Sequence, residues 1–493
     1  MPTPETFTKF GKFVIASGKE LWGELRVAGK NSLLYLRDDE RFDPFVRRDG
    51  LMTGILHDLT KVTLLQCTNL TGLGYASRKD ETYYHTNIFP HFVLEGQRHL
   101  AADERIISKV TFKLEDGTNL FYDFDAFGSV IDARPHIERV AMANEIDRPI
   151  PFGPEPKIVY FAGKREILSV ETSLGHVRVE HNPSWRLPDP RGVRIDNFIS
   201  ISIDMPDAVR FDEAILRTLR LLRFLELIIG RPQNLQTMFV QVEGNDTERL
   251  KVHWSHRPAR REELEEEKSS PQPADMLVMP IEDPEEFCRV IRFWLENDDQ
   301  RQDARGRFHS SFAMQRRYTV DRLVASANMF DILTISAVPQ DEILTADLLN
   351  AKGDAQKIFE ALPHSYERDS VLSALGRVGK ASLKHKTRHR GQIVIDALGA
   401  RPPNLLFVLD SAVDCRNHYV HGTPSKIEYS KNFDLVIFFT NTLEFVFGAS
   451  ELVEGGWDIQ RFAQRGTTMT HPYGSYLVGY KRNLEDLKRF LNV

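Results

Sequence analysis

The sequence predicts an α+β protein of several domains, in which β-rich modules are followed by an all-α helical bundle. In the first half, short runs of alternating or continuous apolar residues are separated by Gly, Asn and Asp, which is typical of strands. In the second half, apolar residues recur at the three-to-four spacing of helices. A chain of 493 residues is also too long for one ordinary core, so we expect two or three domains.

Residues 1–140 are predicted to form a first β-rich module. The runs that alternate in polarity, or are continuously apolar, predict strands over residues 12–18, 23–29, 61–70, 91–96 and 109–124. Inside the last run, Asp116-Gly-Thr-Asn119 has the composition of a hairpin turn. We therefore expect the chain to reverse there and pair with itself.

Residues 141–256 are predicted to form a second module that mixes strands with one helix. Strands are expected over 150–172, 176–182, 198–205, 236–244 and 249–255. The period changes to that of a helix over residues 211–230, where the pattern ends at Gly230-Arg-Pro.

A charged segment, residues 257–276, separates these modules from the helical part. It contains Pro and Ser and almost no large apolar side chains, so it is predicted to be a linker or exposed insertion. An acidic functional patch is the alternative. From residue 277 to 493 we expect an all-α domain with helices over 284–297, 310–335, 355–362, 368–378, 392–398, 404–418 and 433–453.

Composition favours a cytoplasmic protein. No uninterrupted apolar run has the length needed to span a bilayer, and the N-terminal residues lack the apolar core of a signal peptide. The three cysteines, Cys67, Cys288 and Cys415, are widely spaced and odd in number, which argues against a disulfide framework or a zinc ribbon. A net charge of −6 gives no overall attraction to nucleic acid, so RNA binding requires a local basic patch.

Several familiar ligand motifs do not occur in this chain. There is no phosphate-binding loop of the GxxxxGK[ST] type and no HExxH or GxSxG motif. The glycines of residues 71–77 favour a turn over a dinucleotide site. Asp38, Asp39 and Glu40 fit a solvated turn, with metal binding as the alternative. We therefore predict neither a cofactor nor a metal site.

The segment from residue 382 to 392 is densely basic within an acidic protein. Such a cluster neutralises backbone phosphates without reading sequence, and a solvated basic loop is the alternative. Two of its histidines are spaced one helical turn apart, but no nearby Cys or carboxylate completes a metal site. The RNA-binding candidates are Lys384, His385, Lys386, Arg388, His389 and Arg390.

The stretch CRNHYVHG, residues 415–422, carries the strongest chemical signal. If the preceding helix continues to His421, then Asn417 and His421 share one face and Arg416 lies beside it. A histidine near neutral pKa can accept a 2′-hydroxyl proton or protonate a leaving 5′-oxygen. An arginine fork can hold phosphate oxygens, and Asn417 can orient either partner.

Two questions about this stretch stay open in the sequence. Cationic residues at a helix C-terminus offset the helix dipole, so Arg416 and His421 have a purely structural interpretation as well. Acid–base catalysis also needs a second histidine. That group is either His418 or the His421 of a second copy placed face to face by two-fold symmetry.

The pattern of Arg416, Asn417 and His421 followed by Gly resembles the R-x4-6-H motif of HEPN ribonucleases, on what we expect to be the penultimate long helix. The stretches 23–36, 54–70 and 89–117 resemble the first N-terminal module of ApeA-type proteins, which precedes a C-terminal HEPN domain. The resemblance thus implies a HEPN-like helical bundle at the C-terminus.

This resemblance implies a metal-independent endoribonuclease of a prokaryotic antiphage, abortive-infection system. It implies a homodimer through the helical domain, tRNA cut at its anticodon loop, and 2′,3′-cyclic phosphate ends. The N-terminal modules are expected to sense a phage protein or restrain the nuclease, with no membrane partner. The alternative is a non-catalytic dimeric binding or sensor protein. A helical domain that binds nucleotides without cutting RNA has only the basic segment in its favour.

Overall fold

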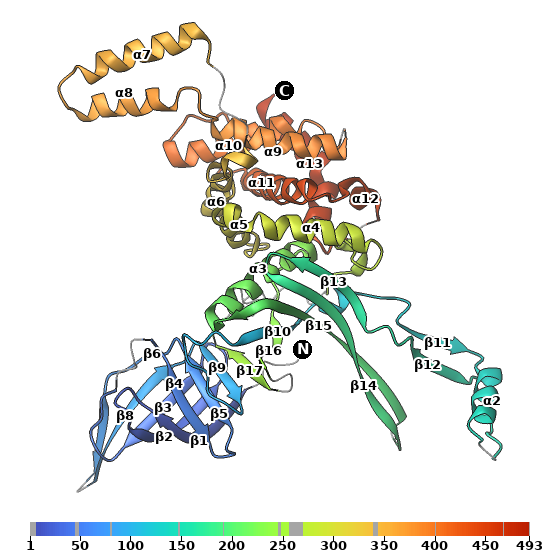
Figure 1. Ribbon diagram of the computed structural model, residues 1–493. Coiled ribbons are helices and arrows are strands. Elements are labelled where there is room, and N and C mark those ends of the chain that lie inside the picture. Colours follow the sequence, from blue (N-terminus) through green and yellow to red (C-terminus); the bar gives the residue numbers. More distant parts are fainter. Residues whose placement is uncertain are drawn as a thin grey trace. The chain divides into compact units, whose positions relative to one another are not determined.

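The computed structural model describes residues 6–44, 49–78, 81–145, 148–190, 192–244, 248–255, 270–338, 344–399, 401–466 and 468–492. The chain divides into two compact units, Met1–Cys288 and Arg289–Val493. The first is rich in antiparallel strands and the second is helical, which confirms the predicted α+β class (Figure 1).

One antiparallel sheet runs through most of the first unit. Within the described residues it has 15 strands in the order β13-β14-β15-β10-β16-β17-β9-β5-β4-β1-β2-β3-β8-β6, and β7 pairs with β8. The strands are β1 (Phe7–Val14), β2 (Glu20–Val27), β3 (Leu33–Asp38), β4 (Met52–Leu56), β5 (Lys61–Leu65), β6 (Thr68–Asn69), β7 (Gly74–Arg78), β8 (Glu81–Phe89), β9 (Phe92–Gly96), β10 (Ile107–Leu114), β13 (Glu166–Thr172), β14 (Gly175–Asp189), β15 (Gly192–Val209), β16 (Leu235–Val242) and β17 (Arg249–Trp254). A separate ribbon pairs β11 (Phe127–Ile131) with β12 (Lys157–Phe161).

Helical segments also accompany the strands in the described part of this unit. They are α1 (Gly117–Leu120), α2 (Arg134–Ala143), α3 (Phe211–Ile229) and η2 (Pro273–Asp275). As predicted, α3 ends at Gly230, whose φ of 92° suits a residue without Cβ.

The predicted modules 1–140 and 141–256 are joined by this sheet. Strand β10 lies between β15 and β16, and β9 pairs with β17, so strands from both segments alternate. The predicted linker, residues 257–276, also includes residues that belong to the folded unit. Its residues 257–269 lie outside the described part, but Met276 and the following Leu277 are buried, and the Leu277 N–H donates to the Ile228 carbonyl.

The hairpin predicted at Asp116–Asn119 is wrong. Residues after Asp116 form the short helix α1 instead, and β10 pairs with β15 and β16 rather than with its own continuation. The Asp116 carboxylate is 2% exposed and accepts hydrogen bonds from Arg231, whose Nε lies 2.6 Å away, and from Gln233. A buried carboxylate needs such partners, so a contact across more than a hundred residues overrides the local turn preference.

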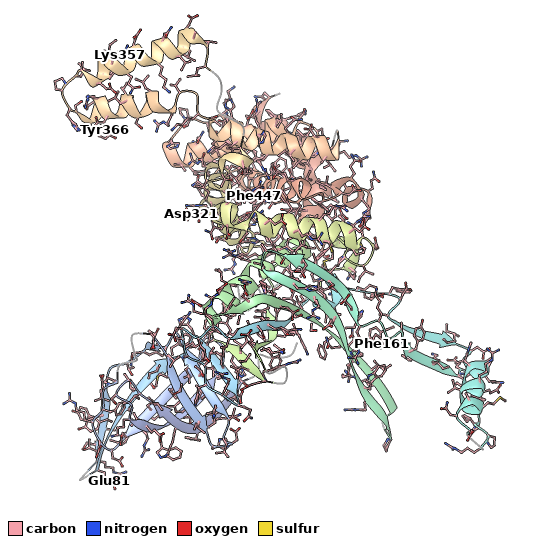
Figure 2. The ribbon with its side chains drawn as sticks, in the orientation of Figure 1. Glu81, Phe161, Asp321, Lys357, Tyr366 and Phe447 are labelled. Carbon is pink, nitrogen blue, oxygen red and sulfur yellow. The ribbon has the colours of Figure 1, made fainter. Side chains whose placement is uncertain are left out.

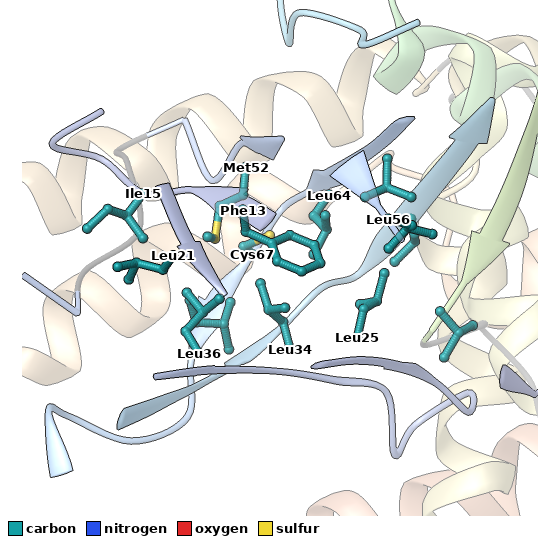
Figure 3. Packing of buried hydrophobic residues seen from close by; sticks show 14 of the residues in the cluster. Phe13, Ile15, Leu21, Leu25, Leu34, Leu36, Met52, Leu56, Leu64 and Cys67 are labelled. Carbon is teal, nitrogen blue, oxygen red and sulfur yellow. The ribbon is translucent and has the colours of Figure 1, made fainter. Parts of the chain in front are cut away.

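Alternating apolar side chains of the N-terminal strands form a compact core. Phe13, Leu25, Leu34 and Leu64 are each 0% exposed and lie in one cluster (Figure 3). A Cβ at Gly54 would approach the Phe13 ring to 2.4 Å, so glycine at that position permits the close packing of β4 on the ring. This core explains why the alternating pattern of the sequence predicted strands.

A cluster of three side chains links β9 to β1 and to β17. Lys9 Nζ donates to Glu95 Oε1 at 2.8 Å, and His253 Nε2 lies 3.0 Å from Glu95 Oε2. The hydrogen bond from His253 lowers the pKa of Glu95 to about 2; burial opposes this shift, and Lys9 adds to it. The ionised carboxylate therefore stabilises this junction of the sheet.

The second unit is built around the long apolar helix α11 (Phe433–Glu454). Nearly all of its length is buried, including Phe447 (Figure 2). Helices α5, α6, α9, α10 and α13 pack against it. The helices are α4 (Pro284–Glu296), which contains the unit boundary, α5 (Asp298–Phe312), α6 (Val320–Asp331), η3 (Ile335–Ala337), α7 (Ala346–Glu360), α8 (Tyr366–Arg377), α9 (Leu383–Leu398), α10 (Leu405–His421), α12 (Ile459–Gln464) and α13 (Pro472–Leu491).

By length and composition, α11 is the one helix in the described part of the chain that meets the requirements for crossing a membrane. Asp434, Asn441 and Glu444 interrupt its apolar residues, so α11 is not an uninterrupted apolar run. In the most apolar 18-residue window, 83% of the helix is buried inside the protein, as in a core helix.

Buried charges are concentrated on α11. Glu451 is 0% exposed and accepts hydrogen bonds from Arg301 at 2.6 Å, Arg305 at 2.7 Å and Arg390 at 2.9 Å. Burial alone would raise the pKa of Glu451, but the three guanidinium groups hold it below its usual value. Two turns before it, Glu444 accepts two hydrogen bonds of 2.8 Å from Arg322.

Two expectations about the helices are corrected. The segment 310–335 is not one helix, because α5 ends at Phe312 and α6 starts after Thr319, whose side chain accepts a hydrogen bond from the Arg322 N–H. The helix carrying the CRNHYVHG stretch is not the penultimate long helix, since both α11 and α13 follow it. Apolar spacing did not reveal α5 because that helix is mostly polar and buries arginines.

Replacing Glu451 with Ala should destabilise the helical unit by about 3–5 kcal/mol, because three buried guanidinium groups would lose their shared acceptor. Urea unfolding followed by circular dichroism measures this loss. The matched control is Glu367→Ala, an exposed glutamate of α8, which should change stability by less than about 0.5 kcal/mol. Equal stability of the two variants would show that the buried cluster is not needed for the fold.

Replacing Glu95 with Gln should weaken the sheet near neutral pH but not in acid. The folded-state pKa of Glu95 lies below its ordinary value, so its carboxylate stabilises the fold above about pH 4.5 and this contribution is lost as pH falls toward 2. The stability difference between wild type and variant, measured by urea unfolding, should therefore shrink between neutral pH and acid. Glu81→Gln, an exposed change in β8, should show no such convergence.

Candidate functional site

The C-terminal turn of α10 carries the polar residues singled out in the sequence. Its apolar face, including Val408, Ala412 and Cys415, is buried against the other helices of the unit. The helix continues to His421, as expected, and ends at Gly422, whose φ is 67° and whose N–H donates to the His418 carbonyl. Local sequence therefore determines where the helix ends and leaves its last polar turn at the surface.

Arg416 is the centre of this turn. Its Nη1 donates to Asn417 Oδ1 and lies 3.0 Å from His421 Nε2, and its Nη2 donates to Asn328 Oδ1 at 2.9 Å. A guanidinium can only donate, so in this arrangement Nε2 of His421 accepts and the neutral ring carries its proton on Nδ1. The structure thus brings Arg416, Asn417 and His421 into one hydrogen-bonded group.

The group is accessible from solvent. His421 is exposed, and Arg416 and Asn417 are half-buried. Arg416 Nε is itself buried and makes no hydrogen bond within the described residues, so one donor of the guanidinium is not used by the protein. An anion that reaches this surface meets a positioned cation beside an imidazole.

Asn328 of α6 is a member of the group that sequence reasoning missed. It lies on a helix whose neighbouring residues Ala327 and Met329 are 0% exposed. A single Asn within a helix gives no signal of its own, and the residues lie 88 positions apart in the chain. Only the packing of α6 against α10 places its carbonyl oxygen on Arg416.

His418 has a different position and a different role. Its Nδ1 lies 2.8 Å from the Thr423 carbonyl, which can only accept, so this nitrogen donates across the end of the helix. The ring also packs against Tyr419 and Tyr429. No hydrogen bond joins His418 to Arg416 in the described structure, so His418 stabilises the helix end and is not brought into the group.

Neither the thiol nor the phenol beneath the turn is a candidate nucleophile. Burial raises the pKa of the Cys415 thiol to about 12 and that of Tyr429 to about 12. Both groups therefore stay protonated near neutral pH, and a reactive thiolate does not form there.

The basic segment lies on α9 and much of its charge is paired. Lys384 contacts Asp414 at 2.7 Å, and Arg388 contacts Asp410 at 2.9 Å, both on α10. Lys386 Nζ donates to the Asp331 carbonyl at 2.8 Å. The alternative of a solvated basic loop is thus replaced by a helix whose cations also hold α9 to its neighbours.

The prediction that Arg390 binds RNA is wrong. Arg390 is 0% exposed and binds Glu451 and Glu454, so it belongs to the buried charge cluster. His385 is exposed, whereas His389 is half-buried and its pKa is lowered by burial and by the neighbouring Arg390. Within the described residues, no group of three or more His, Cys, Asp or Glu is arranged to hold a metal ion.

The acidic turn after β3 also has a partner. Asp38 contacts Lys19 Nζ at 2.5 Å, and Glu40 contacts the same ammonium at 2.9 Å. Hydrogen bonding to Lys19 lowers the pKa of Asp38. These carboxylates thus form an ordinary surface ion-pair group.

Comparison with known proteins identifies the first unit. The family model of the ApeA N-terminal domain 1 matches residues 11–294, which is more than half of the 493-residue chain. The match runs from within β1 into α4 and so spans the joined sheet described above. No match was found among curated proteins or among solved structures. The resemblance of the N-terminal stretches is thereby confirmed, and the chain belongs to the ApeA family.

Proposed function

We propose that this protein is a HEPN-type endoribonuclease that cuts RNA in the cytoplasm during phage infection. Membership of the ApeA family indicates an antiphage defence protein. The helical second unit is consistent with a HEPN domain. The proposal concerns the reaction, its residues, its substrate and the assembly that performs it.

The observation that carries the proposal is the hydrogen-bonded group of Arg416, His421, Asn417 and Asn328. A cation that can bind phosphate, Arg416, is hydrogen-bonded to an acid–base group, His421, on an accessible helix end. In the free protein Arg416 donates a hydrogen bond to Nε2 of His421. An RNA phosphate is a stronger acceptor for the guanidinium, so its binding would release that nitrogen for proton transfer.

The reaction needs no atoms beyond the RNA itself. A base takes the proton of a 2′-hydroxyl, the 2′-oxygen forms a bond to the adjacent phosphorus, and the bond from phosphorus to the 5′-oxygen breaks. An acid protonates that leaving oxygen, which gives a 2′,3′-cyclic phosphate and a 5′-hydroxyl. In this scheme His421 is the acid or base, and Arg416 stabilises the charge that builds on the phosphate oxygens.

The structural alternative, in which these residues only cap the helix, has less support. The helix end already has Gly422 in the left-handed conformation and the His418 hydrogen bond to Thr423. Arg416 instead reaches sideways to α6. The capping requirement is met without Arg416 or His421, so a different role is favoured for them.

For the substrate we propose tRNA, cut in its anticodon loop, with RNA held in part by the exposed cations of α9. Because Lys384 and Arg388 are paired with carboxylates, they would exchange those partners for phosphates. The N-terminal sheet would recognise a phage protein or restrain the nuclease before infection.

One copy supplies one histidine, so we propose a homodimer that brings two copies of the group together. The hairpin of α7 and α8 is a surface suited to this assembly. Neither helix has a buried residue, and Leu349, Ile358 and Tyr366 are 52%, 64% and 85% exposed. With four basic and five acidic side chains, the two helices have almost no net charge, which suits a second copy better than RNA.

Replacing His421 with Ala should lower RNA cleavage roughly a hundred- to ten-thousand-fold, as expected for an acid–base group, without changing stability. Arg416→Lys should also reduce cleavage sharply, since lysine keeps the charge but loses the planar fork. Asn328→Ala should have a smaller effect through the orientation of Arg416. The measurement is small-RNA cleavage on denaturing gels from infected and uninfected cells that express each variant.

The control for this series is His364→Ala, an exposed histidine that precedes α8 and lies outside the group. It should cut RNA as the wild type does. Phage protection that persists in the folded His421→Ala and Arg416→Lys proteins, with RNA unchanged in all of them, would favour the non-catalytic sensor.

A Leu349→Asp/Ile358→Asp double variant should shift the protein from dimer to monomer, because each charge would have to be buried in the interface. Light scattering coupled to size-exclusion chromatography measures the mass. Asn350→Asp adds a carboxylate to the same helix at a polar site and should leave the dimer intact. A double variant that remains dimeric would move the interface away from the hairpin.

A further inference from the structure

A cavity of about 570 Å³ lies in the helical unit, apart from the α10 C-terminal turn. It is open to solvent on one side and is lined by α12, by α13, by the end of α9 and by the segment 401–404 that precedes α10. This volume is within the range of roughly 300–1,000 Å³ that holds small molecules in proteins.

The wall of this cavity is largely apolar. Its lining includes Leu398, Phe462, Leu477 and Leu484. Tyr480 also lines it and donates its hydroxyl to the Pro403 carbonyl at 2.9 Å, so its polar end is already satisfied and its ring contributes apolar surface. A ligand inside therefore needs an aliphatic or aromatic body.

The rim of the cavity carries cations with no partner. Arg401, Lys481 and Lys488 make no side-chain hydrogen bond or ion pair with any described residue, although the protein as a whole is acidic. The cations of α9 form a contrast, because Lys384 and Arg388 bind carboxylates of α10. Glu485 is the one carboxylate among the lining residues, so the rim has a net positive charge.

We propose that this cavity binds a small amphipathic anion, a molecule with one acidic group and an aliphatic or aromatic body. The acidic group would lie among Arg401, Lys481 and Lys488, and the body would displace water from the apolar wall. A nucleotide fits less well, because the donors and acceptors on the edge of its base would be buried without partners. The site is independent of the proposed RNA cleavage.

The test uses the full-length protein and the fluorescent aryl sulfonate 1-anilinonaphthalene-8-sulfonate. Saturable binding with one site per chain is expected, with displacement by decanoate and not by decylamine, which has the same chain and the opposite charge. The double variant Lys481→Glu/Lys488→Glu should weaken binding at least about tenfold. Its folding should be unchanged, because neither lysine has a partner to lose.

Two further variants complete the experiment. Ala463→Trp would fill the cavity with an indole and should abolish saturable binding while the thermal unfolding midpoint is maintained. Lys380→Glu reverses the charge of one exposed lysine outside the cavity and should bind as the wild type does. Equal displacement by decylamine and decanoate, or unchanged binding in both cavity variants, would overturn the proposal.

Discussion

The buried carboxylate of Glu451 is the interaction on which the helical unit depends. Three arginines from two other helices converge on it, and Glu454 receives two of them as well. A buried charge is tolerated only when it is fully paired, so this cluster requires α5, α9 and α11 to keep one arrangement.

The candidate site follows from that arrangement. Helix α6 is tied to α11 through Arg322 and Glu444, and α10 packs against both α6 and α11. These contacts determine that Asn328 and Arg416 face each other. A polar group at the end of one helix thus acquires a defined geometry from charges buried elsewhere in the same unit, which supports its assignment as a positioned site.

In the first unit, backbone hydrogen bonds between strands hold the two predicted modules together in one sheet. Its strands come from segments that local patterns separate, yet β10 lies between β15 and β16, and β9 pairs with β17. Backbone hydrogen bonding therefore joins what would otherwise be two modules. The Lys9, Glu95 and His253 group lies at that junction, where it adds a side-chain contribution to the ladder. The family match covers this joined sheet, which agrees with its behaviour as one compact unit.

The sequence by itself determined the α+β class, most of the strands, the helix that ends at Gly230, and the helix face shared by Asn417 and His421 with Arg416 beside it. These features depend on local periodicity, on residues that end helices and on spacing along one helix, all of which are properties of neighbouring residues.

Only the tertiary structure decided the features that depend on distant residues. Asn328 contacts Arg416 from another helix. Arg390 is buried in an ion pair with Glu451, and Lys384 and Arg388 of α9 are paired with carboxylates of α10. Asp116 likewise takes part in a buried contact with Arg231 instead of a hairpin. In each case a polar or charged side chain finds its partner far along the chain, and no local pattern encodes that choice.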